Sequence, residues 1–282
     1  ADAQLAATLL ALLAREDVLS AQPQRWLGAG GTPTTDEEYA GELTLSPSQF
    51  ERALACPLRW FLTTVGADGP SNAAASLGTL IHAVAEEHPH GTPEELTEAL
   101  EARIEELGYN LDTWAGRHSD RRARAIVENL ASYLVGIPGR VDVEQKVEAQ
   151  VEGVTIRGRM DRLEYVDEGV RVTDLKTGSN PDPYRKVDEN AQLAAYQLAL
   201  LASGEDVAGA RIALLGTKKK PQTFDQKPLQ GEALAQWRNK VREVAESARG
   251  PYFEARPSDA ACAYCSFDRL CPARERGHKV VE

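Results

Sequence analysis

Positive charge is scarce in this sequence of 282 residues, in which 32 lysines and arginines stand against 43 aspartates and glutamates. The formal net charge of -11 makes a nucleic-acid binder unexpected, because phosphate contacts normally come from lysine and arginine. The sequence has no internal repeat and no phosphate loop of the G-x4-G-K-(S/T) type. Any ATP-driven motor that works with it therefore lies on another chain or on a part of the protein outside this sequence.

Long polar tracts and a basic leader are also absent. With 42% hydrophobic residues, the chain can bury a substantial core, so we expect one large α/β domain with appendages. Residues 3–16 predict an amphipathic helix rather than a secretory signal or membrane span, which leaves the cytoplasm as the default location. Residues 21–44 are rich in glycine, proline and threonine and predict a linker. The expected division is 1–44 for helix and linker and 45–282 for the main domain.

Cysteine is rare as well, with four in the whole chain. Cys262, Cys265 and Cys271 form a C-x2-C-x5-C pattern, and Cys56 lies far upstream. Disulfides are one interpretation, but x2 spacing in a cytosolic chain favours metal ligation by thiolates. Zinc and an iron–sulfur cluster both accept four cysteines, and spacing alone does not choose between them.

Two local clusters run against the acidic balance. One is Arg117, Arg121, Arg122 and Arg124 on a helical segment, and the other is Lys218–Lys220 in an expected loop. Each is either solvated charge or a phosphate contact. We expect the isolated chain to bind DNA weakly and a partner to deliver the strand.

Hydrophobic periodicity predicts helices first and strands next. Ser46 and Pro47 open a helix that contains Cys56, since serine caps free amides and proline in the first turn lacks an N–H. Further helices are expected at 73–88, 92–107, 119–135, 188–203 and 231–248. Alternation and turn residues predict an antiparallel meander with strands at 141–151, 154–166 and 170–175, followed by a strand at 210–216. This order predicts an α/β sandwich in which the meander carries an active-site edge.

The third strand of the meander holds the densest polar pattern. Period-2 alternation places Asp174 and Lys176 on one face with Val172, and Leu175 on the other. A carboxylate beside an ammonium suits a divalent metal next to a polarised water, which is the chemistry that cuts a phosphodiester. An exposed lysine at the end of a strand is the ordinary alternative.

The preceding strand contains Asp161, and the hairpin turn brings it close to Asp174. Two carboxylates about 4 Å apart repel by roughly 1 kcal/mol in water and about 4 kcal/mol at an effective dielectric of 20. A divalent cation between them would remove this cost. The alternative is a surface ion pair of Asp161 with Arg159 or Arg162.

Helical spacing supplies three more candidates. His82 lies one turn after Gly78, whose missing side chain leaves space above an imidazole that could ligate Mn²⁺ and, less readily, Mg²⁺. Gln192 and Tyr196 are four residues apart and share a helix face, from which they could brace Lys176 or hold a phosphate. Glu144, on the first strand, is a weaker candidate for an additional carboxylate.

Together these motifs resemble the RecB-type branch of the PD-(D/E)XK nuclease superfamily. The resemblance is carried by segments in the same order, namely Leu45–Phe50, Ala55–Phe61, Gly78–His82, Gly158–Arg162, Asp174–Gly178 and Gln192–Tyr196. The four cysteines are similar to the split iron–sulfur frame of the AddB and AdnB nuclease modules. The resemblance covers about residues 45–275 and implies a restriction-endonuclease-like core.

The resemblance also implies roles for individual residues. His82, Asp161, Asp174 and the Leu175 carbonyl would bind Mg²⁺ or Mn²⁺, and Lys176 would be the catalytic lysine. Gln192 and Tyr196 would form an accessory motif. A 4Fe-4S cluster would tie the entry helix to the C-terminal segment through Cys56, Cys262, Cys265 and Cys271.

The sequence departs from this branch in one respect, because the branch usually continues into a helicase. We therefore expect an excised C-terminal module of a helicase–nuclease that processes double-strand breaks, with residues 1–44 as the remnant of a tether. Its expected partners are DNA and a helicase motor. A standalone nuclease and a catalytically inert DNA-binding module are the alternatives.

Overall fold

The computed structural model of the chain describes residues 2–22, 37–67, 77–104, 108–137, 139–217, 219–263 and 265–274. Its helices are α1 (Asp2–Arg15), α2 (Pro47–Ala55), α3 (Pro57–Thr64), α4 (Leu77–Glu87), α5 (Pro93–Glu101), α6 (Trp114–Val135), α7 (Ala191–Ala202), α8 (Gly231–Ala248) and α9 (Asp259–Cys262). Its strands are β1 (Leu43–Leu45), β2 (Val141–Val151), β3 (Val154–Val166), β4 (Gly169–Lys176), β5 (Val207–Leu214) and β6 (Gln222–Gln226). No helix of these described segments has the length and apolar character required to cross a bilayer.

The strands form one mixed sheet around the predicted meander. β2 pairs antiparallel with β3 along its length except at Glu144, and β3 pairs antiparallel with β4, which confirms the predicted meander. β5 then runs parallel to β4, and β6 closes this side antiparallel to β5. The α/β class predicted from the order of elements is therefore confirmed.

One edge of β3 is shared by two strands. β1 pairs parallel with residues 154–156 of β3, and β4 pairs with residues 162–166. Between these segments, residues 157–160 pair with β2 alone among the strands described, and the register has no pair for Asp161. The sheet is open at this point, and backbone groups there can be reached by side chains.

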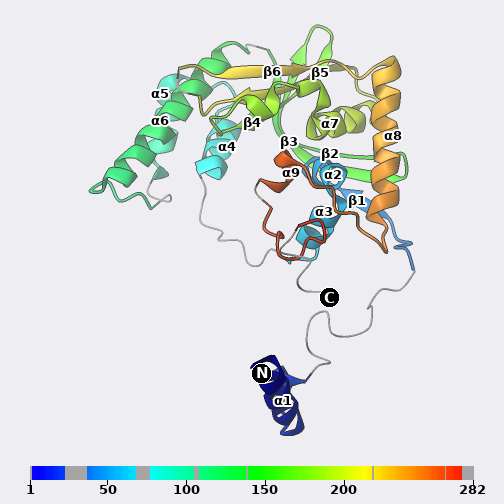
Figure 1. Cartoon of the computed structure of the whole chain (residues 1–282). Helices are drawn as coiled ribbons and strands as arrows, with labels where there is room; N and C mark the ends of the chain where they lie inside the picture. Colours follow the sequence, from blue (N-terminus) through cyan, green and yellow to red (C-terminus); the bar gives the residue numbers. More distant parts are fainter. Residues whose placement is uncertain are drawn as a thin grey trace.

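Helices cover both faces of the sheet (Figure 1). One core joins α2, α3, α7 and α8 to the sheet, and Val172 belongs to it. The other core joins α4, α5 and α6 to the opposite face, and it contains Leu175. The alternation predicted for this strand is therefore confirmed. In Figure 1, α1 lies apart from this layered body.

The entry segment begins as predicted but does not continue as one helix. Ser46 and Gln49 form a reciprocal capping box at the start of α2, with Pro47 in the first turn. The prediction that Cys56 lies inside this helix is wrong, because Cys56 has φ -162° and ψ 101° and separates α2 from α3. The ring of Pro57 disfavours helical backbone at the residue before it, so the helix stops and a new one starts.

Other boundaries differ by a few residues. Short 3₁₀ turns at Asp182–Tyr184 and Val187–Glu189 precede α7, whose start is capped by the Asn190 side chain. β1 and β6 were not predicted. Parts of some expectations lie outside the described residues, namely positions 23–36 of the linker, positions 73–76 and 105–107 of two expected helices, and Lys218.

Packing at Gly158 generates a test of the fold. A Cβ atom at Gly158 would lie 2.7 Å from Pro47 Cδ, so we expect Gly158→Ala to cost about 1–3 kcal/mol through overpacking. The thermal midpoint should fall by roughly 2–4 °C per kcal/mol. Circular dichroism melts measure this shift. Gly178→Ala is the matched control, since no atom lies within 4 Å of its built Cβ, and equal midpoints for the two variants would contradict the packing argument.

Candidate active site and metal centre

Asp161 lies at the open position of β3 and joins three elements. Its Oδ2 accepts a hydrogen bond of 2.7 Å from the backbone N–H of Leu175 on β4. Its Oδ1 lies 3.3 Å from Nδ1 of His82 on α4. The surface pairs considered for Asp161 are not formed, because Arg159 pairs with Glu144 and Arg162 lies 3.6 Å from Glu164. The carboxylate is therefore held where the strand and the helix meet.

The backbone around Asp161 is irregular. Met160 packs in the core on the α7 side, whereas the guanidinium of Arg162 donates a hydrogen bond to the Pro89 carbonyl after α4. Strict alternation would put both residues on one face, so the direction of the side chains changes at Asp161. Glu144, opposite on β2, has φ 50°, a left-handed conformation that is uncommon outside glycine. Such irregularities re-aim side chains beside active sites.

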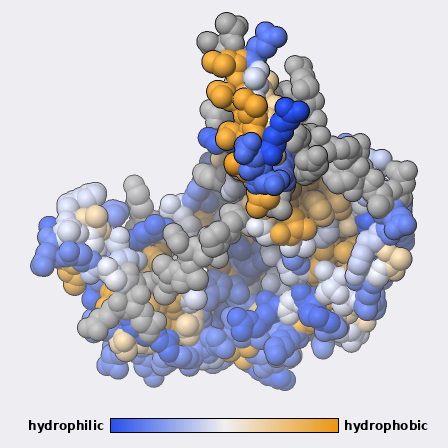
Figure 2. Space-filling view, turned by 90° about the horizontal axis from the view of Figure 1, so that it is seen from below, coloured by the Kyte–Doolittle hydropathy of each residue, from blue (hydrophilic) through white to orange (hydrophobic). Residues whose placement is uncertain are grey.

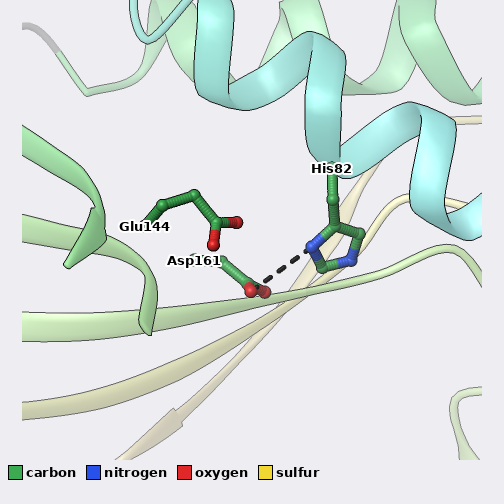
Figure 3. Close-up of side chains that lie close together, drawn as sticks. All are labelled: His82, Glu144 and Asp161. Carbon is green, nitrogen blue, oxygen red and sulfur yellow. Dashed lines mark ion pairs between the residues drawn. The ribbon is translucent and has the colours of Figure 1, made fainter. Parts of the chain in front are cut away.

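His82, Glu144 and Asp161 form a candidate metal centre. One ligand atom from each of the three residues lies within 4.8 Å of the other two. Figure 3 shows the imidazole descending from α4 toward the two carboxylates on the neighbouring strands, with the ion pair to Asp161 dashed. These residues line a cavity of about 450 Å³ together with Gly78, as expected if the missing side chain leaves room above the imidazole.

Asp174 and Lys176 lie together on β4, as the alternation predicts. Lys176 Nζ is 2.7 Å from Asp174 Oδ2, and it also donates to Gln192 Oε1 at 3.3 Å. The Gln192 amide donates in turn to Asp174 Oδ1 at 2.8 Å. This closed triangle fixes the ammonium and the carboxylate relative to α7.

Tyr196 does not contact the groups that Gln192 contacts. Its hydroxyl donates a 2.8 Å hydrogen bond to the Arg159 carbonyl on β3, in the segment that lacks a second strand partner. The side chain therefore ties α7 to β3 next to the candidate site, and it contacts the backbone instead of Lys176.

Burial and neighbouring charges shift the titration of these groups. Burial raises the pKa of Asp174, and the nearby Lys176 partly offsets this. Burial lowers the pKa of Lys176, but Asp174 more than compensates, so the pKa of the ammonium is raised. The hydrogen bond to Asp161 raises the pKa of His82. The site therefore stabilises positive charge beside its carboxylates, as expected of a place that attracts a cation.

Glu51 on α2 is a site residue that was not predicted. Burial raises its pKa, and the charges of Lys176 and Asp174 act on it. Asn190 lies 3.5 Å from its carboxylate. A signal was present, since Glu51 is four residues after Pro47 and one after Phe50 and so falls within the apolar stripe of the entry helix.

The cysteines gather at the C-terminal side. Cys262, Cys265 and Cys271 line one cavity of about 610 Å³ together with Asp268 and Arg274. All four cysteines are free thiols, so disulfides are not formed. Hydrogen bonds to Ser258 and Arg274 lower the pKa of Cys262, which favours the thiolate that metals bind.

Cys56 lies at the junction of α2 and α3, and the C-terminal segment runs past it. The N–H of Leu58 donates to the Glu254 carbonyl at 3.1 Å. Arg59 donates to the Ala261 carbonyl at 2.7 Å, next to Cys262. Phe61 stacks on Phe253 with ring centroids 4.0 Å apart. Before Cys56, Arg256 donates to the Leu54 carbonyl at 3.3 Å, so the C-terminal segment contacts the chain on both sides of Cys56.

Known proteins are similar to this chain over most of its length. Residues 44–272 match the sequence profile of the PD-(D/E)XK nuclease superfamily, and the chain belongs to that superfamily. A gene 69 protein of Mycobacterium phage D29 is 27% identical over 267 residues, which cover 80% of this chain and 96% of the phage protein. Among solved structures, a putative exonuclease from Eubacterium rectale is similar with 15% identity and a TM-score of 0.48, covering 84% of this chain and 92% of that one.

The His82–Asp161 pair generates a pH prediction. In metal-free protein, the histidine pKa measured by NMR should exceed the ordinary value of about 6.5, and Asp161→Asn should lower it because the charged acceptor is lost. A raised pKa means that the pair stabilises the fold below the unfolded-state pKa, and this contribution is lost as pH rises through the folded-state pKa. His82→Asn assigns the signal. An unchanged pKa in Asp161→Asn would contradict the pairing.

Proposed function

We propose that this chain is a metal-dependent deoxyribonuclease that hydrolyses phosphodiesters. The observation that carries the proposal is the convergence of His82, Glu144 and Asp161 within 4.8 Å, beside a buried ion pair of Asp174 and Lys176. Each group alone has an ordinary explanation. An imidazole, several carboxylates and one ammonium gathered at the open part of a sheet are the set that metal-assisted hydrolysis requires.

The donor set fits a divalent cation. We propose His82, Asp161, Asp174 and the Leu175 carbonyl as ligands of Mg²⁺ or Mn²⁺, with Glu144 as an additional carboxylate. The Oδ2 atom of Asp174 is buried and accepts no hydrogen bond of suitable geometry from a described residue, although the Lys176 ammonium lies 2.7 Å away. A carboxylate oxygen has two lone pairs, so this atom can also ligate a cation. When bound, the cation would lower the pKa of a coordinated water and neutralise phosphate charge. The imidazole favours Mn²⁺.

Lys176 is the proposed catalytic lysine. Asp174 keeps its ammonium charged, so it can hold the attacking water by hydrogen bonds and stabilise the negative charge that develops on phosphate. Gln192 positions both groups of the pair. Tyr196 positions Gln192 through its contact with β3, since both side chains lie on the same face of α7.

The proposed biological setting is a helicase–nuclease that resects double-strand breaks, with DNA as substrate and a helicase motor as partner. The order of motifs and the cysteine frame support it. A standalone exonuclease is favoured by another observation, because the phage relative is matched over 96% of its own length and so consists almost entirely of the region shared with this chain. A catalytically inert DNA-binding module is a third candidate.

Substitution of Lys176 tests the activity. We expect Lys176→Ala to reduce Mn²⁺-dependent cleavage of labelled linear DNA by roughly 10²–10⁴-fold, as for loss of a group that positions water and stabilises charge. Gel assays on linear and circular DNA measure the effect and distinguish cleavage from ends from internal cleavage. Arg238→Ala, which removes an exposed arginine of α8 that pairs with Glu152 and is not among the site residues, should cleave as the wild type does. Undiminished cleavage by Lys176→Ala would refute the assignment, and no cleavage by the wild type would favour the inert module.

We also propose that the four cysteines hold a 4Fe-4S cluster that ties the entry helices to the C-terminal segment. A cavity of about 610 Å³ between three cysteines supports this. Among the described residues, no group of three cysteines brings its sulfurs within 4.8 Å of one another. A tetrahedral zinc site with Zn–S distances of about 2.3 Å requires tighter convergence. The cluster would stabilise the fold, and no step of hydrolysis passes through it.

Metal content tests this assignment. Anaerobically purified protein should be brown and contain about four iron and four sulfide per chain, since the cluster type defines this ratio. Cys262→Ser should lose most of the iron and lower the thermal midpoint, because one of the connections across the two segments is removed. Lys176→Ala is the matched control and should keep its iron. Colourless wild-type protein with stoichiometric zinc would overturn the cluster in favour of a zinc site.

A further inference from the structure

Helix α6, which carries one basic segment, and the chain just before the other basic segment both contact the loop after β4. Arg122 of α6 donates a 3.4 Å hydrogen bond to the carbonyl of Thr177, the residue after Lys176. The chain after β5 reaches the same loop, because a Cβ at Gly216 would clash with the carbonyl oxygens of Thr177 and Gly178. Lys219 and Lys220 follow directly and are exposed. Residues that are distant in sequence therefore bring positive charge to the edge of the candidate site.

The arginines of α6 differ in whether they already have partners within the chain. Arg124 is neutralised by Glu101 and Asp120. Arg117 is occupied with the Leu111 and Asp112 carbonyls before α6. By contrast, the exposed side chain of Arg121 forms no ion pair with a described residue. It is available to a ligand.

An exposed aromatic pair lies on the same helix. The side chain of Trp114 is 70% exposed, although an indole of this size is normally largely buried. It stacks on His118, one turn further along, with an interplanar angle of 9°. One face of α6 carries side chains at helical spacing, namely Trp114, His118, Arg121 and Arg122. From Trp114 to Arg122, which contacts Thr177, the helix rises roughly 12 Å.

We infer that Trp114, His118, Arg121, Arg122, Lys219 and Lys220 form a platform for single-stranded DNA. The inference rests on the proposed nuclease function and identifies where its substrate is held. Aromatic side chains that stack on bases, next to cations that follow the phosphates, are the combination that binds single strands without sequence preference. The indole binds an unstacked base, and the cations lead the backbone toward Lys176.

The charge distribution favours this ligand over an acidic protein surface. The whole chain carries a formal charge of -11, so exposed cations that form no ion pair with a described residue are a local departure from the acidic surface, and Arg122 among them contacts the loop next to Lys176. Figure 2 shows hydrophilic side chains in a hollow between the lobe that carries α5 and α6 and the remainder of the molecule. A duplex presents no unstacked bases along its length, so Trp114 selects a single strand.

The test measures binding of fluorescein-labelled oligo(dT), and of a duplex of equal length, to the full chain in EDTA by fluorescence anisotropy. We expect Trp114→Ala to weaken oligo(dT) binding roughly tenfold, as for loss of one stacked base, with a smaller effect on the duplex. Trp114→Phe should retain most of the affinity. Arg121→Ala should reduce the slope of log K against log salt by about 0.7, as for one phosphate contact to a single strand.

Arg242→Ala is the matched charge control. It also removes one exposed arginine, from α8, which lies on the far side of the molecule from α6 in Figure 1, so its salt dependence should equal that of the wild type. Equal oligo(dT) affinities for wild type, Trp114→Ala and Arg121→Ala would overturn the platform, as would undetectable binding by the wild type at low salt. An equal loss for oligo(dT) and duplex in Trp114→Ala would refute base stacking.

Cleavage is scored separately, so that the two proposals fail independently. If the wild type cuts DNA in Mn²⁺ and Trp114→Ala binds oligo(dT) normally, the platform proposal is refuted and the nuclease proposal stands. If the wild type binds oligo(dT) through Trp114 and does not cut DNA, the platform proposal stands and the nuclease proposal is refuted.

Discussion

The hydrogen bond from the Leu175 N–H to the Asp161 carboxylate is the interaction on which the candidate site depends. β1 and β4 occupy the two ends of one edge of β3, and this carboxylate takes the place of a strand partner between them. The same carboxylate holds His82 of α4. The Asp161 side chain therefore connects β3 to β4 where the two strands are no longer paired, and it also holds the imidazole of His82. A buried Arg162 directly after it anchors the loop that follows α4.

Burying the charged groups of the site without their partners would cost free energy. Asp174 is buried, and its charge is compatible with that environment because Lys176 and Gln192 contact both carboxylate oxygens. Glu144 and Asp161 line a separate cavity with His82, which is the place proposed for a cation. Positive charge toward solvent is supplied by α6 and by the chain after β5. The proposed platform would give this acidic protein a localised route by which phosphate can approach.

Local chemistry predicted many elements correctly. The capping box at Ser46, the hairpins of the meander and the faces of Val172 and Leu175 follow from interactions within a few residues. The failure at Cys56 was also local, since Pro57 should have indicated a break. By contrast, β1 has three residues and owes its existence to pairing with β3, so no local pattern announces it. The position of Glu51 in the entry helix was visible in the sequence, but its closeness to the charges of Asp174 and Lys176 depends on the tertiary structure.

By itself, the sequence determined which residue types are available and which share a face of a helix or strand, because those relations depend on backbone periods of 3.6 and 2. It thereby placed Asp174 beside Lys176 and Gln192 beside Tyr196. The tertiary structure alone decided that Glu144 reaches His82 and Asp161, that Tyr196 contacts the β3 backbone, and that Arg122 and Gly216 both reach Thr177. These contacts join separate elements, and their geometry depends on strand divergence and helix packing, which no local period encodes.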